Sequence, residues 1–275
     1  MTSGSGHGPE SGNAGSPPER ERAIWRRRQL ILGTSSPDRN YPSDACSVQA
    51  AIGAVNAVAF DISAACAGFI FAMNIVEGFF KAGIYKTALI IGAETLSKVT
   101  DWSDRGTCVL FGDGAGAAVL KAEETGIIDM MMGADGTKGD VLACTSRTVG
   151  NFLTGTKPEL GFMTMDGQEV FKFAVRKVPE SVMELLQRTG TKKEDIKYYV
   201  LHQANERIIE AAARRLKEPM EKFPMTISQF GNTSTASIPL LLDDMIRKDM
   251  LKKGDKIIMS GFGAGMTWGA VLMEW

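Results

Sequence analysis

Short apolar runs that suit buried β-strands alternate with stretches of helical spacing, and they do so twice along the chain. In the first set, the strand pattern AVAFDIS precedes a helix pattern at residues 67–82, and the strand pattern TALIIGAE follows. In the second set, YYVLHQA precedes the helix pattern ANERIIEAAARRL, and the strand patterns KIIMSGF and WGAVLMEW end the chain. This alternation predicts an α/β fold built from two halves that are similar in the order of their elements.

The remaining patterns set the expected boundaries. LILGTSS and GAGAAVLKAE read as strands, SIPLLLDDMIRKDM reads as a helix, and a long helix ends at Gly190. Thr191 to Glu194 has the sequence of a capping box for a short further helix. Residues 1–19 are rich in Gly, Ser and Pro, and a basic run follows them. We therefore expect a disordered tail and basic run at 1–29, a first half at 30–150 and a second half at 151–275.

Composition narrows the class of protein. The chain has 275 residues, of which 44% are hydrophobic and 23% are charged, as in soluble globular proteins. The formal net charge of -1 favours neither nucleic acid nor an anionic membrane as a partner. No apolar run is long enough to span a membrane, and the N-terminus has no apolar signal core. Four cysteines without CxxC spacing read as reduced thiols, so we expect a cytoplasmic protein without a metal site.

One of these thiols, Cys66, stands where a strand pattern turns into a helix pattern, in FDISAACAGF. A buried cysteine often acts as a small hydrophobic residue, and that interpretation stays open. The alternative is a nucleophile. A helix N-terminus favours the thiolate, and the small residues around the thiol would let a substrate carbonyl approach.

Two polar residues could assist such a thiol. The chain has two histidines; His7 lies in the tail, which leaves His202 at the end of a strand as the candidate partner. Asn232 lies in FGNTSTASIP, just before an apolar helix, where Thr233 or Ser234 could serve as a helix cap. A cap does not require Asn232, and its amide N–H could stabilise negative charge on a substrate carbonyl.

Two glycine-rich segments have different interpretations. In SGFGAGMTWGAVL the glycines permit a tight turn and a close backbone approach, and the amides of Ala264 and Cys66 could form an oxyanion hole. FGDGAGAAVL looks like a phosphate-binding loop, but a strand pattern follows the glycines instead of a helix. We interpret this second segment as a tight packing element.

Seven strings, taken together and in order, resemble the β-ketoacyl-acyl-carrier-protein synthase III family of condensing enzymes. They are TSSPDRNYPSDACSVQ, FDISAACAGF, DRGTCVLFGDGAGAAVL, MDGQEVFKFAV, LHQANERII, FGNTSTAS and GFGAGMTWG. The resemblance implies a thiolase-like fold with two pseudo-equivalent βαβ halves in a five-layered α-β-α-β-α arrangement, here with an incomplete first half.

The resemblance also implies a Cys-His-Asn triad at Cys66, His202 and Asn232. Cys66 would take an acyl group from a short acyl-CoA, and acetyl-CoA is the expected substrate. His202 and Asn232 would then hydrogen-bond the thioester oxygen of malonyl-acyl-carrier protein as CO2 leaves, and the amides of Cys66 and Ala264 would hold the tetrahedral oxyanion. Thiolases proper use a second cysteine in the C-terminal glycine turn. GFGAGMTWG has none, which favours decarboxylative condensation.

Further residues match the family's binding positions. Arg105 matches an arginine that stacks on the CoA adenine, and Tyr41 matches an aromatic residue that the partner subunit inserts at the acyl pocket. The expected carrier-protein contacts are Gln203, Ala204, Asn205, Glu206 and Arg207. The resemblance implies a cytoplasmic homodimer of fatty acid synthesis that uses acyl-CoA and acyl carrier protein as substrates and no cofactor or metal.

The chain departs from the family before Leu30. Family members have a long portion there, with a first central strand and a GIRERR-like segment that helps to bind CoA. We expect a truncated chain that folds poorly or binds CoA weakly, and an inactive or partner-binding homologue is the main alternative. A sister enzyme that makes a secondary metabolite or 3-hydroxy-3-methylglutaryl-CoA is another. A papain-like protease fits the separation of Cys66 and His202, but CGSCW-type surroundings are absent.

Overall fold

A computed structural model describes residues 28–146, 148–159 and 161–275. Its strands form two four-stranded sheets, in the orders β2-β1-β3-β4 and β5-β10-β9-β8, and a separate pair of short strands, β6 and β7. The first sheet comprises β1 (Arg28–Gly33), β2 (Ala57–Ile62), β3 (Thr87–Glu94) and β4 (Gly114–Lys121). The second comprises β5 (Ile127–Gly133), β8 (Ile196–Leu201), β9 (Lys256–Gly263) and β10 (Thr267–Glu274). The short pair is β6 (Leu142–Cys144) and β7 (Met163–Met165).

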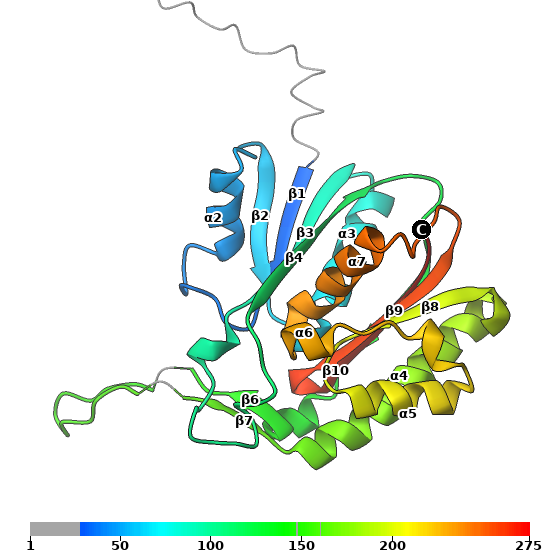
Figure 1. Cartoon of the computed structure of the whole chain (residues 1–275). Helices are drawn as coiled ribbons and strands as arrows, with labels where there is room; N and C mark the ends of the chain where they lie inside the picture. The colour runs from blue at the N-terminus through cyan, green and yellow to red at the C-terminus, as the bar shows by residue number, and fades with distance from the viewer. Residues whose placement is uncertain (1–27, 147, 160) are drawn as a thin grey trace, which may run out of the picture.

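The helices lie in three layers around the two sheets (Figure 1). They are α2 (Asp44–Ala51), α3 (Gly68–Lys81), α4 (Gly167–Thr189), α5 (Glu206–Leu216), α6 (Ile227–Phe230) and α7 (Ser237–Arg247). Apolar residues of α2 pack on the outer face of the first sheet, those of α4 and α5 pack on the outer face of the second, and α3 and α7 fill the space between the sheets. The layers therefore follow the order α-β-α-β-α, as the resemblance implies.

Most of the predicted elements are confirmed. The strand TALIIGAE matches β3, and the long helix ends at Gly190, whose φ of 66° closes it in the left-handed conformation. The Asp166 carboxylate accepts from the backbone N–H groups of Gln168 and Glu169 and so begins this helix. The capping box at Thr191 to Glu194 is wrong. A short 3-10 turn begins after Lys192 there without a side-chain cap.

The expected domain boundaries change in two places. Arg28 and Gln29 belong to β1, so order begins before Leu30; the expected tail at residues 1–19 lies outside the described residues. β5 precedes residue 150 but pairs antiparallel with β10 in the second sheet. Strand pairing therefore divides the chain between β4 and β5, and the boundary expected at 150 is too late.

The first sheet has no internal gap, because β1 pairs in parallel with both β2 and β3, and β3 pairs with β4. The expectation that a central strand is missing is wrong for this structure, since a further strand could join only at an edge. In the second sheet, β5 covers the edge of β10. Among the described strands, none covers the corresponding edge of β4.

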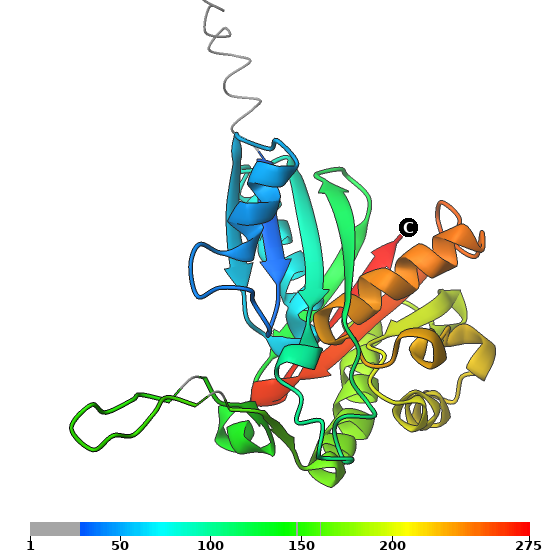
Figure 2. The ribbon, with the colours of Figure 1, turned by 60° about the vertical axis from the view of Figure 1, so that its left-hand side comes forward.

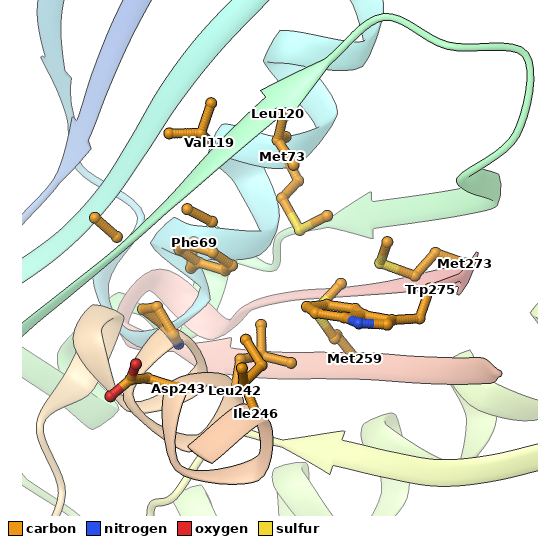
Figure 3. Close-up of a pocket in the computed structure, with 13 residues that line it drawn as sticks. Phe69, Met73, Val119, Leu120, Leu242, Asp243, Ile246, Met259, Met273 and Trp275 are labelled. Carbon is orange, nitrogen blue, oxygen red and sulfur yellow. The ribbon is translucent and has the colours of Figure 1, made fainter. Parts of the chain in front are cut away.

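Beside β4 lies an apolar cavity of about 420 Å³. Figure 3 shows Met73 of α3, Leu120 of β4, Ile246 of α7 and Trp275 around it. In the second sheet, β5 packs against α3, and its apolar residues join the central core. The cavity therefore marks a structural difference between the two halves.

Candidate active site

Cys66 lies where the sequence places it, between a strand and a helix. β2 ends at Ile62, a 3-10 turn (Ala65–Ala67) carries the thiol, and α3 begins at Gly68. Cys66 is buried, and so are Ala64 and Ala67 beside it. The strand-to-helix junction predicted from FDISAACAGF is thus confirmed.

The small residues around Cys66 make room for the protein's own backbone. A Cβ at Gly68 would lie 2.9 Å from the side chain of Thr235, and one at Gly263 would lie 2.6 Å from the amide nitrogen of Cys66. Such separations are shorter than van der Waals contact, so both positions need glycine. The expectation that small neighbours clear a path for substrate is therefore wrong at Gly68, where the space is already filled, whereas the close backbone approach expected at Gly263 is confirmed.

His202 follows the last residue of β8 and is 2% exposed. Its backbone N–H donates to the carbonyl oxygen of Ser260 at 2.8 Å, and its Nδ1 lies 2.6 Å from the Oγ of Ser237. The ring packs edge-on against Phe262, with centroids 5.4 Å apart. Because Nδ1 is occupied by Ser237, Nε2 is the nitrogen left to act on a substrate.

Asn232 is held through its backbone and through its side-chain oxygen. Its N–H donates to the carbonyl oxygen of Leu110, and its own carbonyl accepts from the N–H of Gly112, both at 2.9 Å. Its Oδ1 accepts from the backbone N–H of Ser234 at 2.9 Å. Since the oxygen is used internally, the Nδ2 amide is the end that can donate to a substrate carbonyl.

The two sequence interpretations of this region have different outcomes. A Cβ at Gly112 would lie 2.2 Å from the carbonyl oxygen of Phe230, so FGDGAGAAVL is confirmed as a packing element. The helix-cap interpretation of Thr233 or Ser234 is wrong. No side chain caps the turn at Ser234–Ala236, and the Ser234 hydroxyl donates to Glu94 at 2.9 Å.

One pocket of about 210 Å³ brings Cys66, His202 and Asn232 together. β6, β7, α4 and α5 contribute to its wall, and so does the segment before β4. The other residues that line it are Gly106, Leu110, Phe111, Leu142, Met165, Gly167, Val170, Phe171, Ala204, Asn205, Ile208, Phe262 and Gly263. No Asp, Glu, Lys or Arg lines this pocket, and its titratable side chains are the thiol and the imidazole.

Burial dominates the protonation of the thiol and the imidazole. It raises the pKa of Cys66 to about 12; the Ser234 hydroxyl lowers that pKa, the charge of Glu94 raises it, and the amide of Cys66 itself lowers it. Burial also lowers the pKa of His202 to about 3. The expectation that the helix N-terminus yields a thiolate is therefore wrong for the resting site, which holds a neutral thiol and a neutral imidazole.

The glycine turn after β9 approaches the nucleophile as predicted. Gly265 has a φ of 72° in the turn Ala264–Met266, and Gly263 faces the amide of Cys66. The Thr267 hydroxyl lies 3.1 Å from the carbonyl oxygen of Ala64 and 3.2 Å from that of Ala264, so it joins the two segments. The amides of Cys66 and Ala264 consequently belong to backbone segments that are fixed to each other.

The outer residues differ in accessibility. Arg105 is exposed beside Gly106 of the pocket lining, and Tyr41 is 85% exposed, outside that lining. Glu206 and Arg207 are exposed at the start of α5. Ala204 and Asn205 line the pocket, and Asn205 caps α5 by accepting from the N–H of Arg207.

Gln203 is a correction to the expected carrier-protein contacts. It is 1% exposed, its Nε2 donates to the carbonyl oxygen of Leu201 at 2.8 Å, and its Oε1 accepts from the N–H of Thr226 at 2.9 Å. A side chain that is buried and hydrogen-bonded at both ends cannot contact a partner protein. Gln203 instead fixes the chain after β8.

Sequence reasoning missed Glu94 and Ser237, two buried polar residues that hold the site. Glu94 ends an apolar strand, IIGAE, and a carboxylate at the end of a buried strand could have indicated a functional or structural role. Ser237 begins an apolar helix and carried no such signal. Its contact with His202 joins residues far apart in the chain.

No group of three or more His, Cys, Asp or Glu side chains in the described part of the chain is placed to hold a metal ion. Within the same residues, no helix is both long enough and apolar enough to cross a membrane.

A thiol, an imidazole and a carboxamide in one pocket between two similar α/β halves define the class of thiolase-like condensing enzymes. Residues 60–136 match the family described as 3-Oxoacyl-[acyl-carrier-protein (ACP)] synthase III, and residues 186–275 match that family's C-terminal part. The β-ketoacyl-[acyl-carrier-protein] synthase III of Clostridium acetobutylicum is 50% identical over 248 residues, which are 90% of this chain and 76% of the relative.

Solved structures agree. The Aquifex aeolicus 3-oxoacyl-[acyl-carrier-protein] synthase III is 43% identical with a TM-score of 0.83, over 92% of this chain and 79% of the other. The Thermus thermophilus β-ketoacyl-[acyl-carrier-protein] synthase III is 40% identical with a TM-score of 0.84, over 92% of this chain and 78% of the other. The chain belongs to the β-ketoacyl-[acyl-carrier-protein] synthase III family.

Proposed function

We propose that this protein is an acyltransferase that condenses a short acyl-CoA with malonyl-acyl-carrier protein, releases CO2 and so begins fatty acid synthesis. The observation that carries the proposal is the convergence of Cys66, His202 and Asn232 on one small pocket. The names of the relatives support the same reaction and the same carrier protein.

The first half-reaction acylates Cys66. Its thiol is protonated at neutral pH, so Sγ attacks the thioester carbon of acyl-CoA as the proton passes to Nε2 of His202. The bond between the carbonyl carbon and the CoA sulfur breaks, and CoA leaves as a thiol with the proton from His202. The low pKa of the buried imidazole favours this return, because His202 does not hold the proton.

The second half-reaction forms the new carbon–carbon bond. Loss of CO2 from the malonyl thioester leaves an enolate, whose oxygen accepts from Nε2–H of His202 and Nδ2–H of Asn232. Two aimed donors of this kind contribute roughly a hundredfold or more in rate. The enolate carbon attacks the acyl carbon on Cys66, and the amides of Cys66 and Ala264 hold the oxyanion. As the ketone carbonyl re-forms, the bond to Sγ breaks, and the departing Cys66 thiolate takes a proton from water.

We also propose a homodimer. Among the described strands, β2 is an edge strand, and its Val58 is 48% exposed. The loop between β6 and β7 reaches away from the body (Figure 2), and its Phe152 is 98% exposed. These apolar groups suit burial by a second copy, which would also bring Tyr41 to a neighbouring pocket. Size-exclusion chromatography with light scattering tests the dimer, and a monomeric mass at working concentration would refute it.

The remaining assignments concern substrates and compartment. Arg105 would bind the CoA nucleotide, and Arg207 would bind the carrier protein, because both are exposed at or near the pocket. Cys46, Cys66, Cys108 and Cys144 are all free thiols, which supports a reducing compartment such as the cytoplasm. The proposed chemistry uses neither metal nor cofactor.

The deciding experiment is the intact mass of the purified chain after incubation with acetyl-CoA, beside Cys66→Ala. A gain of one acetyl group on the parent and none on the variant supports the proposal. A folded parent that gains no acetyl group would contradict it and would favour an inactive homologue.

A further inference from the structure

A buried carboxylate that the condensation does not use lies close enough to the nucleophile for its charge to act on the thiol. Glu94, at the end of β3, is 4% exposed. Its two oxygens accept from five uncharged donors, namely the hydroxyls of Thr34, Ser36, Ser234 and Thr235 and the backbone N–H of Ser35. A buried carboxylate is costly unless its hydrogen bonds are made, and here each oxygen has at least two donors.

The two oxygens face different parts of the site. Oε2 accepts from the segment after β1, with the Ser36 hydroxyl nearest at 2.7 Å. Oε1 accepts from the turn before α7, with Ser234 at 2.9 Å and Thr235 at 3.1 Å. Glu94 therefore joins the first sheet to the segment that carries Asn232.

The bonds continue to the neighbours of both reacting residues. The Thr235 hydroxyl donates both to Glu94 and to the carbonyl oxygen of Ala65, which lies 2.7 Å from the Thr235 Oγ1. Ala65 directly precedes Cys66 in the chain. Ser234 donates its backbone N–H to Oδ1 of Asn232 at 2.9 Å. The carboxylate is thus linked to Asn232 through Ser234, and to the nucleophile through Thr235 and Ala65.

Both intervening turns are strained. Ala65 has a φ of 46° and Ser234 a φ of 50°, in the left-handed region that residues with a Cβ rarely occupy. Such conformations persist only where the surroundings impose them. The Glu94 network, together with the close contact of Gly68 with Thr235, supplies that constraint at both turns.

We propose that Glu94 is a positioning residue of the condensation: through Thr235 it fixes the Ala65 turn and hence Cys66, and through Ser234 it fixes Asn232. This inference rests on the proposed function. Glu94 touches neither substrate nor reacting atoms. It acts by holding thiol and carboxamide toward the same substrate, and a misplacement of about 1 Å at such a site can cost a hundredfold in rate.

The charge of Glu94 has a second, measurable effect on the thiol. Glu94 of β3 acts on Cys66 through its charge from outside the pocket, and the titratable side chains of the pocket lining are Cys66 itself and His202. Burial is the main reason that the pKa of Cys66 is high, and the negative charge of Glu94 raises it further. Removing the charge should therefore lower that pKa and speed alkylation.

The test compares Glu94→Gln with Glu94→Asp. In Glu94→Gln we expect acetylation of Cys66 by acetyl-CoA and decarboxylation of malonyl-acyl-carrier protein to slow about tenfold or more, with KM within about twofold of the parent. Acetylation should still reach one group per chain, which excludes a loss of folded protein. Alkylation of Cys66 by iodoacetamide at pH 8 should rise roughly three- to tenfold, and Glu94→Asp, which keeps the charge, should retain the parent's alkylation rate.

Thr235→Val decides the question if Glu94→Gln does not fold. It keeps the charge and the shape but removes the shared proton, so acetylation should slow several-fold while alkylation stays at the parent rate. The inference is overturned if Glu94→Gln carries out both half-reactions at the parent's rates, or if Thr235→Val is acetylated at the parent's rate. A parent chain that fails to acetylate refutes the proposed function instead, and alkylation, which needs no substrate, still reports on the charge.

Discussion

The Nδ1 of His202 lies 2.6 Å from the Oγ of Ser237, and the backbone N–H of Gln203 donates to the same hydroxyl at 3.3 Å. A hydroxyl can accept from Nδ1–H or donate to an unprotonated Nδ1. Acylation needs Nε2 as a proton acceptor, whereas decarboxylation needs Nε2–H as a donor. Ser237 can satisfy the buried ring nitrogen in either tautomer.

We expect Ser237→Ala to slow both half-reactions about tenfold, because the imidazole loses the partner that orients it and leaves a buried nitrogen unpaired. The rates of Cys66 acetylation and of malonyl-acyl-carrier-protein decarboxylation measure this. Ser181→Ala is the matched control, since the Ser181 hydroxyl is also buried but donates within α4, to the carbonyl oxygen of Lys177 at 2.8 Å. Equal rates in parent and Ser237→Ala would remove Ser237 from the mechanism.

The buried imidazole predicts a loss of stability in acid. The pKa of His202 is lowered to about 3 in the folded chain, and the ordinary value of 6.5 applies when the chain unfolds. Below pH 6.5 the unfolded state binds the extra proton, so the free energy of unfolding falls by up to about 1.4 kcal/mol per pH unit as pH decreases toward 3. Urea unfolding of the parent and of His202→Gln between pH 7 and pH 4.5 measures this change in the free energy of unfolding. The variant should lose less stability over this range, and parallel curves would contradict the prediction.

Glycine at position 263 is required by the backbone of Cys66. A Cβ there would lie 2.6 Å from the Cys66 amide nitrogen, so Gly263→Ala should displace the thiol's turn, lower stability by about 1–3 kcal/mol and slow acetylation. Thermal unfolding and acetylation kinetics measure the two effects. Gly78→Ala in α3 is the control, because no atom lies within 4 Å of its added Cβ, and it should stabilise the chain by about 0.5–1 kcal/mol. An unaltered acetylation rate in Gly263→Ala would refute the steric argument.

Regular periodicity made most of the fold predictable. β3 and α3 have long apolar patterns, and their observed ends lie within a residue or two of the predicted ones; α4 ends at Gly190 as predicted. α2 was missed because DACSVQAA has few large apolar residues, and β5 was missed because IIDMMMG does not alternate. Because β5 pairs with β10, which is far along the chain, the two halves divide before β5 and not at residue 150.

The residues of the site could be predicted from the sequence, but their burial and protonation state could not. Cys66, His202 and Asn232 could be named from their junctions, and the structure brings them to one pocket. The state of the thiol could not be read, because the burial that raises its pKa to about 12 comes from segments distant in sequence. The Glu94 and Ser234 contact spans 140 residues, and no local pattern encodes a contact of that range.

The start of α5 predicts how the carrier protein binds. Arg207 is exposed beside the pocket, whereas Gln203 is buried, so charge at Arg207 should dominate the contact. We expect Arg207→Glu to raise the KM for malonyl-acyl-carrier protein about tenfold, with the KM for acetyl-CoA unchanged, because the substitution reverses the positive charge that is proposed to bind the carrier protein. Initial rates at several salt concentrations measure this, and the difference in KM between variant and parent should narrow as salt screens the charges.

Arg247→Glu on α7 is the control. It reverses an exposed charge on a helix that does not line the pocket, and it should leave both KM values unchanged. If Arg207→Glu raises the two KM values equally, the defect lies in the pocket and not in carrier-protein binding.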